Sequence, residues 1–405
     1  MAIFPRRLAT VLAVAGLGLA SACGQGNAVG SSPAAASQAW VDQPVGFEVG
    51  GLTVYATYRH PTARATGTAA RTAVPAVLLV AGSGPTDRNG NSPLLPGLVN
   101  TLEVIADWLS ADGVASLRYD KLGSGRTGLG PYASRPGAIG IGPFEQEAAA
   151  GLRFLARQPG VDRDRLAVIG HSEGALFALL LATGADPEAG PESPSPGPES
   201  PSPGHENPGP GPESPGPESP RPEARPLPPV RALGLLEPLS VRYLDVIADQ
   251  VDAQVAAAQR TGQITPGQAG TFTHALATAI TSLRATGTVP PGLPPGLSGV
   301  LSPQTALFLS QADRYDPAQL AARVSPGLPV LVTCSNADVQ VTCGEVRHLL
   351  AGLARAPADT DFVPLTGVDH VLKQDPTGAA ANYAKPLPHS RQLQRALRTF
   401  VTRNL

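Results

Sequence analysis

The pentapeptide Gly170-His171-Ser172-Glu173-Gly174 is the most informative stretch of this 405-residue chain. It directly follows the apolar run Leu166-Ala167-Val168-Ile169 and opens the apolar stretch 175–181. Between a strand and a helix, a Gly-x-Ser-x-Gly sequence is typical of a sharp turn that lifts a serine hydroxyl clear of a sheet edge. The chain has 45 glycines, so the bare pattern is weak and its context carries the interpretation. We therefore expect Ser172 to be a nucleophile.

Two residues further along the chain complete the chemistry that a reactive serine needs. A serine hydroxyl becomes a nucleophile when an imidazole takes its proton, and that imidazole needs a carboxylate to fix its tautomer. Asp338 follows the apolar run 330–333, and His370 follows the segment 362–365. We expect both at the carboxyl ends of strands, as Ser172 is, so the three side chains should meet at one edge of the sheet.

Other residues are weaker candidates for these two roles. His171 neighbours the serine but should point away from it in such a turn. His389 comes after the last expected strand and is the main alternative to His370. Asp369 is the alternative to Asp338, but it abuts His370 along the chain, where the two side chains would diverge. We expect Asp369 to be an exposed loop residue.

Negative charge that develops on a substrate oxygen needs backbone N–H donors nearby. One is expected from Glu173, directly after the nucleophile, and the other from the loop Ala81-Gly82-Ser83-Gly84-Pro85. We assign the second donor to Ser83, with Gly82 or Gly84 as alternatives. A phosphate-binding loop would end in Lys followed by Ser or Thr, and this loop does not.

Strand-length apolar runs alternate with helical patterns along the chain. The expected strands are 76–81, 114–119, 165–169, 232–236, 329–333 and 361–365, and the expected helices include a pattern from Leu98 to Leu109, 144–157 and 390–402. Upstream, the segments 47–49 and 52–58 flank Gly50-Gly51, a β-hairpin signal. This order predicts an α/β fold, an open and mostly parallel sheet led by an antiparallel hairpin.

Two insertions interrupt this core. The core segments are 45–185, 230–237 and 327–405, and the insertions are 186–229 and 238–326. The first contains four copies of Pro-Glu-Ser-Pro, a composition that cannot bury apolar surface and predicts a disordered loop. The second is mostly helical in pattern and is expected to form a lid over the carboxyl edge of the sheet. Its residues Asp245, Asp249 and Asp252 could receive a substrate amine, although a solvated helix face is the favoured interpretation.

The N-terminus has the features of an export signal. Arg6 and Arg7 precede an apolar run, 8–19, that is shorter than the roughly 20 residues of a membrane-spanning helix. Small residues then lead to Cys23, and Ala20-Ser21-Ala22-Cys23-Gly24 resembles a bacterial lipobox, whose cysteine is lipidated. We expect a signal peptide at 1–22, lipidation at Cys23, a tether at 23–44 and a location on the outer face of the cell membrane. The alternative is an ordinary signal peptide and a secreted protein.

The charge and the cysteines of the chain bear on its expected partners, disulfides and cofactors. The formal net charge is −2 and no long basic run is present, so we expect no nucleic-acid partner. Cys334 and Cys343, nine residues apart in an exported chain, predict a disulfide that brackets Asp338. We expect no metal and no organic cofactor.

Three motifs resemble an α/β-hydrolase of the exported bacterial esterase and serine-aminopeptidase-like group. They are the segment from Gly82 to Asn91, Arg118-Tyr119-Asp120-Lys121, and the pentapeptide around Ser172. The resemblance covers about residues 45–185 and 230–400. Such proteins usually carry a histidine where this chain has Ala81, a change that can lower activity. The resemblance implies the α/β-hydrolase fold, with Ser172, Asp338 and His370 as the triad.

The function expected from these features is that of an extracytoplasmic serine carboxylesterase, which cleaves small-molecule or lipid acyl esters through an acyl-serine intermediate. A peptidase, amidase or acyltransferase with the same triad is the first alternative. A catalytically weak surface-binding lipoprotein is the second, and the complete Ser, Asp, His order argues against it.

Overall fold

The computed structural model describes residues 40–62, 73–184 and 226–405. The signal peptide at 1–22, the lipidation site at Cys23, most of the tether and most of the Pro-rich insertion lie outside these residues. Those four expectations therefore stay predictions.

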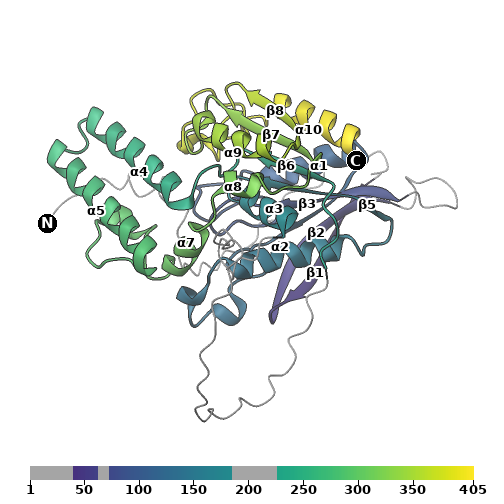
Figure 1. Cartoon of the computed structure of the whole chain (residues 1–405), viewed down its shortest axis with the longest axis horizontal. Helices are drawn as coiled ribbons and strands as arrows, with labels where there is room; N and C mark the ends of the chain where they lie inside the picture. The colour runs from purple at the N-terminus through teal and green to yellow at the C-terminus, as the bar shows by residue number, and fades with distance from the viewer. Residues whose placement is uncertain (1–39, 63–72, 185–225) are drawn as a thin grey trace, which may run out of the picture.

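An eight-stranded sheet forms the centre of the molecule, with the strand order β1-β2-β4-β3-β5-β6-β7-β8 (Figure 1). The strands are β1 (Trp40–Val49), β2 (Leu52–Pro61), β3 (Val74–Val80), β4 (Ala115–Tyr119), β5 (Val161–His171), β6 (Ala232–Leu236), β7 (Pro329–Ser335) and β8 (Asp359–Leu365). The pairs β1–β2 and β2–β4 are antiparallel, and all the others are parallel. The predicted mostly parallel sheet with a leading antiparallel hairpin is confirmed.

The hairpin is longer than expected. Strand β1 begins at Trp40, within the last five residues of the predicted tether, and pairs along the whole of β2 up to Pro61. The tether boundary at residue 44 was therefore wrong. Most of the first five residues of β1 are exposed, as an edge strand allows, so no apolar run marks them in the sequence.

Helices cover both faces of the sheet. Strand β3 alternates between two cores, with Leu78 and Val80 on one face and Val77 and Leu79 on the other. Helices α2 (Gly142–Leu155), α3 (Gly174–Thr183) and α9 (Cys343–Arg355) cover the first face, while α1 (Thr101–Ala111) and α10 (Arg391–Asn404) cover the second. This two-sided burial explains why the central strands are continuous apolar runs.

Helix α1 begins three residues later than its apolar pattern indicates. Asn100 precedes it in the left-handed conformation, with φ 54°, and Leu98 is 67% exposed in the loop before it. The Asn91 side-chain oxygen accepts hydrogen bonds from the backbone N–H groups of Val99 (2.7 Å) and Asn100 (2.9 Å). These bonds hold the chain in a loop where the sequence pattern alone would continue the helix.

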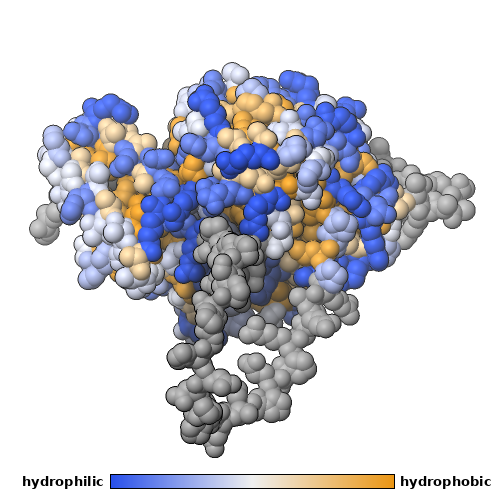
Figure 2. Space-filling model, viewed as in Figure 1, coloured by the Kyte–Doolittle hydropathy of each residue, from blue (hydrophilic) through white to orange (hydrophobic). Residues whose placement is uncertain are grey.

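The second insertion is helical, as predicted. It contains α4 (Tyr243–Arg260), α5 (Pro266–Thr286), α6 (Pro295–Ser298), α7 (Ala306–Ala312) and α8 (Pro317–Ala321). Helices α4 and α5 form a pair that projects from one side of the sheet (Figure 1). Figure 2 shows hydrophobic residues between hydrophilic ones on the visible surface of this pair. Within this insertion, the buried Asp313 carboxylate forms ion pairs with Arg242 (2.7 Å) and Arg284 (2.9 Å).

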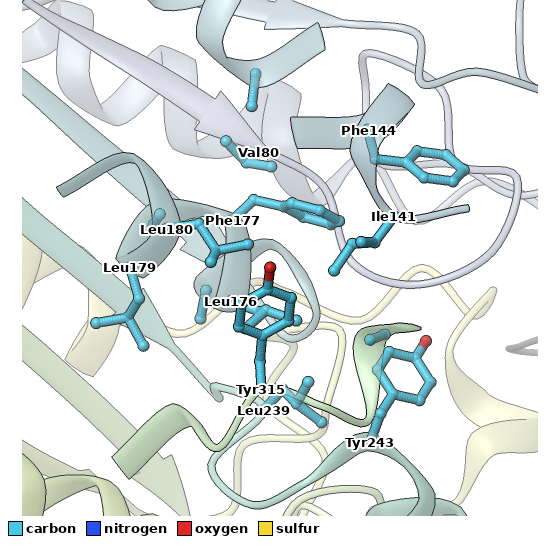
Figure 3. Close-up of a cluster of buried hydrophobic side chains, with 14 of the residues drawn as sticks. Val80, Ile141, Phe144, Leu176, Phe177, Leu179, Leu180, Leu239, Tyr243 and Tyr315 are labelled. Atoms are coloured by element: carbon cyan, nitrogen blue, oxygen red, sulfur yellow. The ribbon is translucent and has the colours of Figure 1, made fainter. Parts of the chain in front are cut away.

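The insertion packs against the helix that follows Ser172. Helix α3 consists mainly of Leu, Ala and Phe, and its residues 174–181 are all buried, as expected for a helix enclosed on every side. Figure 3 shows Leu239, Tyr243 and Tyr315 of the insertion on one side of Leu176 and Phe177, with Phe144 of α2 on the other. The inserted helices therefore share one core with the segment that positions Ser172.

Candidate active site

The turn at Ser172 has the tight geometry that its glycines predict. Ser172 has a φ of 54°, which is rare for a residue with a side chain and marks a strained turn. A Cβ atom on Gly170 would lie 2.2 Å from the carbonyl oxygen of Gly174, and one on Gly174 would lie 2.3 Å from that of Val80. Both positions therefore require glycine, and the strand–turn–helix arrangement is confirmed.

A chain of hydrogen bonds joins Ser172, His370 and Asp338. The Ser172 Oγ lies 3.0 Å from His370 Nε2, and His370 Nδ1 lies 2.7 Å from Asp338 Oδ2. A carboxylate can only accept, so Nδ1 carries the proton and Nε2 is left to accept the serine proton. The structure thus brings together the three residues that the sequence analysis selected.

The carboxylate of Asp338 is itself held in place. Its other oxygen, Oδ1, accepts hydrogen bonds from the backbone N–H groups of Gln340 (2.7 Å) and Val341 (3.1 Å). These bonds fix the carboxyl group and orient Oδ2 toward His370. The predicted disulfide between Cys334 and Cys343 is present, with a Cα–Cα distance of 5.3 Å, and it closes the loop that carries Asp338.

The competing histidines occupy other positions. His171 lies beside His370, with a ring-centroid distance of 5.0 Å, and its Nε2 lies 2.7 Å from the His370 carbonyl oxygen. Burial lowers the pKa of His171 to about 3, so the ring is neutral and donates to that carbonyl. The ring of His389 lies edge-on to Trp108, and burial lowers its pKa to about 4. His370, rather than His389, contacts the serine.

The expectation that Asp369 is exposed was wrong. This residue is fully buried, and its side chain accepts a hydrogen bond from the backbone N–H of Lys373 at 2.8 Å. Burial raises the pKa of Asp369 to about 6. The loop folds back so that Val368 pairs with Gln374, which turns Asp369 inward. A tight return of this kind has no signature in the sequence.

The two predicted oxyanion donors have free amides. Neither the Ser83 nor the Glu173 backbone N–H donates a hydrogen bond to another residue in the described segments. A Cβ on Gly82 would lie 3.2 Å from the Ser172 Cβ, so the Ser83 loop passes directly beside the serine. Glu173 follows Ser172 at the N-terminus of α3, where backbone N–H groups are unpaired. The arrangement can place two donors near an oxygen bonded to the carbon that Ser172 attacks.

A buried ion pair behind this loop was missed in the sequence analysis. Lys121 Nζ donates to Glu173 Oε1 and to the Gly82 carbonyl oxygen, both at 2.7 Å. The hydroxyl of Tyr243, from the inserted helix α4, donates to Glu173 Oε2 at 2.5 Å. The Lys121 and Glu173 side chains are each 4% exposed. One cation therefore fixes both segments that carry the free amides.

A second ion pair braces the rest of the Ser83 loop. Asp120 accepts hydrogen bonds from the Arg88 side chain at 2.6 Å and from the Arg126 backbone N–H at 2.8 Å. Burial opposes ionisation of Asp120, but these bonds still lower its pKa. A Cβ on Gly125 would lie 2.3 Å from the Asp120 carboxyl, so glycine is required there. These contacts give a structural reason for the motif 118–121.

A cavity with a volume of about 80 Å³ opens beside Ser172. Its walls are largely apolar, and they include Leu94, Leu95, Val99, Leu102 and Val371. Polar groups are contributed by Ser92, Thr101, Gln340 and Tyr383. None of the lining residues belongs to the inserted segment 238–326 or is a carboxylate, lysine or arginine. The role of that segment as a lid stays a prediction.

The aspartates proposed to receive an amine are not part of this cavity. Asp245 pairs with Arg284 of α5 at 2.6 Å, within the insertion. Within the described residues, no group of three or more His, Cys, Asp or Glu side chains could hold a metal ion. No described helix is both long and apolar enough to cross a membrane.

No protein-family model and no curated protein matches the chain. The solved structures similar to it include the acylaminoacyl peptidase of Pyrococcus horikoshii, with a TM-score of 0.50 and 13% identity over 91% of this chain and 42% of that one. An esterase of Pyrococcus furiosus (TM-score 0.46, 12% identity, 90% of this chain and 91% of that one) is also similar. Est1E of Butyrivibrio proteoclasticus, solved with bound ferulic acid, is similar as well, with a TM-score of 0.48 and 12% identity over 89% of this chain and 98% of that one. Taken with the strand order and the turn at Ser172, the likeness to the Pyrococcus horikoshii structure shows that this chain has the α/β-hydrolase fold.

Proposed function

We propose that the chain is a serine hydrolase in which Ser172 is the nucleophile. The observation that carries the proposal is the continuous chain of hydrogen bonds from Ser172 Oγ through His370 to Asp338. Burial of all three side chains supports it, because such bonds are stronger where water is excluded.

The reaction follows from this geometry. His370 Nε2 takes the proton of Ser172 as Oγ bonds to the acyl carbon, and the negative charge on the acyl oxygen is met by the N–H groups of Ser83 and Glu173. The imidazolium then gives its proton to the leaving oxygen, and the bond between carbon and leaving group breaks. Water repeats these steps on the acyl-serine, releasing the acid and restoring Ser172.

We infer that the substrate is an ester with a short or medium acyl group. The apolar walls and small volume of the cavity suit an uncharged chain of limited length. A peptidase that recognises a free amino terminus needs an acidic group in its site, and no lining residue supplies one. The lining therefore favours the carboxylesterase over a peptidase that recognises a free amino terminus.

We further propose that the protein is exported and held at the outer face of the cell membrane by a lipid on Cys23. The lipobox-like sequence supports the anchor, and the Cys334–Cys343 disulfide is typical of an oxidising compartment. Metabolic labelling with radioactive palmitate tests this proposal. Label that is retained in Cys23→Ala would contradict it.

Substrate preference can be tested with chromogenic compounds that release the same type of product. The mature protein should hydrolyse nitrophenyl acetate or butyrate with a higher kcat/KM than long-chain nitrophenyl esters and than aminoacyl nitroanilides. Ser172→Ala is the matched control and should be inactive toward all of them. Faster cleavage of the anilides would replace the esterase with the peptidase, and transfer to an added alcohol in preference to water would favour an acyltransferase.

A further inference from the structure

Glu237 is a buried acid that the reaction described above does not use. It directly follows β6, has no exposed surface, and adopts a φ of 43° that is strained for a residue with a side chain. Its backbone N–H donates to Thr333 Oγ1 at 3.2 Å. Its side-chain Oε2 accepts a hydrogen bond from the Ser335 backbone N–H at 3.0 Å. The carboxyl group is therefore fixed against the end of strand β7.

The Glu237 carboxyl lies against another acidic side chain, and one of its oxygens has no donor. Oε1 is buried and receives no hydrogen bond from any donor in the described residues. The Glu237 carboxyl lies in hydrogen-bonding contact with the carboxyl of Asp338, and the other charged group that acts on it is the carboxylate of Asp369. Two ionised carboxylates in contact would repel each other and would leave Oε1 without a donor. A proton on Glu237 removes both problems, because the O–H then donates to Asp338.

We propose that Glu237 is a positioning residue, a neutral carboxylic acid whose O–H donates to Asp338 and holds that carboxylate toward His370. The proposal rests on the proposed function, which makes Asp338 the acid of the triad, and adds a fourth member to the hydrogen-bonded chain. Burial, together with the neighbouring Asp338 charge, raises the pKa of Glu237 well above its ordinary value, in agreement with the neutral form.

This hydrogen bond has a consequence for His370. An O–H that donates to Asp338 draws negative charge from the carboxylate, which then stabilises the protonated imidazole less. Loss of the donor should therefore strengthen the attraction between Asp338 and the imidazolium and move the acid limb of the kcat/KM profile to higher pH.

Two uncharged substitutions test whether Glu237 acts as a hydrogen-bond donor to Asp338. Glu237→Gln keeps a donor for Asp338 and an acceptor for Ser335, whereas Glu237→Met keeps the length but neither function. The titration of His370 can be followed by NMR in the Ser172→Ala background, where no hydrolysis is needed. We expect Glu237→Gln to leave the midpoint of the His370 titration unchanged. Glu237→Met should move this midpoint up by about one pH unit, which is a tenfold change in the ionisation constant.

Infrared spectroscopy reads the proton directly and does not depend on the Met variant folding. The protonated Glu237 carboxyl should give a carbonyl stretch at neutral pH that is lost in Glu237→Gln. Burial raises the pKa of Glu147 to about 8, so Glu147 gives a carboxyl band of its own, and the control Glu147→Gln removes that band while keeping the one from Glu237. Absence of a carboxyl band in Glu147→Gln, or an equal shift of His370 in both Glu237 variants, would overturn the proposal. So would an unchanged His370 titration in folded Glu237→Met. Failure of Ser172 to react with acyl esters would instead count against the proposed function, since neither readout requires turnover.

Discussion

Replacement of Lys121 by methionine should destabilise the protein and slow ester hydrolysis together. Lys121 Nζ holds the Glu173 carboxylate and the Gly82 carbonyl, each at 2.7 Å, in a setting where both charged side chains are 4% exposed. Methionine fills similar volume but leaves the Glu173 carboxylate, among the described residues, with only the hydroxyl of Tyr243. Removal of one partner of a buried ion pair costs about 3–5 kcal/mol, because the remaining charge is uncompensated.

Urea unfolding followed by circular dichroism measures this loss. The control Lys385→Met removes an exposed lysine and should change the free energy of unfolding by less than about 0.5 kcal/mol. The double variant Lys121→Met with Glu173→Gln removes both charges and should recover part of the stability. A loss below about 1 kcal/mol in the single variant, or no recovery in the double variant, would refute the reasoning.

Three further predictions concern the turn, the disulfide and a buried acid. Gly174→Ala places a Cβ 2.3 Å from the Val80 carbonyl oxygen, so it should abolish esterase activity and lower the free energy of unfolding, measured by thermal unfolding, by about 1–3 kcal/mol. Gly270→Ala, whose Cβ would lie in open space, should change neither activity nor stability. Replacing Cys334 and Cys343 by serine should lower the free energy of unfolding by about 2.5 kcal/mol, as expected for a closed loop of this length, and dithiothreitol should then have no further effect. Burial raises the pKa of Glu147 to about 8, above its ordinary 4.5, so its contribution to stability is complete below pH 4.5 and is lost as pH rises toward 8. Glu147→Gln should flatten the dependence of stability on pH over that interval, and an unchanged slope would contradict the assignment.

The sequence was sufficient for the features that depend on local patterns. Central strands buried on both faces leave continuous apolar runs, so β3, β6 and β7 could be located before the structure. The two glycines around Ser172 mark a turn that only glycine permits. Asp338 and His370 could be selected because each follows a strand in the expected chain order, which places them at the same edge of a parallel sheet.

Features that depend on contacts between distant segments could not be found in this way. The charged groups of Lys121 and Glu173 are 52 positions apart in sequence, and nothing nearby shows that they pair. Glu237 and Asp338 are separated by the whole helical insertion, so their contact is a property of adjacent strand ends. Leu98 fits a helical pattern but lies in a loop, because Asn91 binds the chain just before α1.

The central claim is that His370 and Asp338 activate Ser172. Labelling of the mature protein by a fluorophosphonate probe tests this claim most directly, because the probe reacts covalently with an activated serine. The account predicts rapid labelling of the wild type, none in Ser172→Ala, and strongly reduced labelling in His370→Ala with the fold retained. A folded wild-type protein that takes up no label, or label that persists in Ser172→Ala, would contradict it.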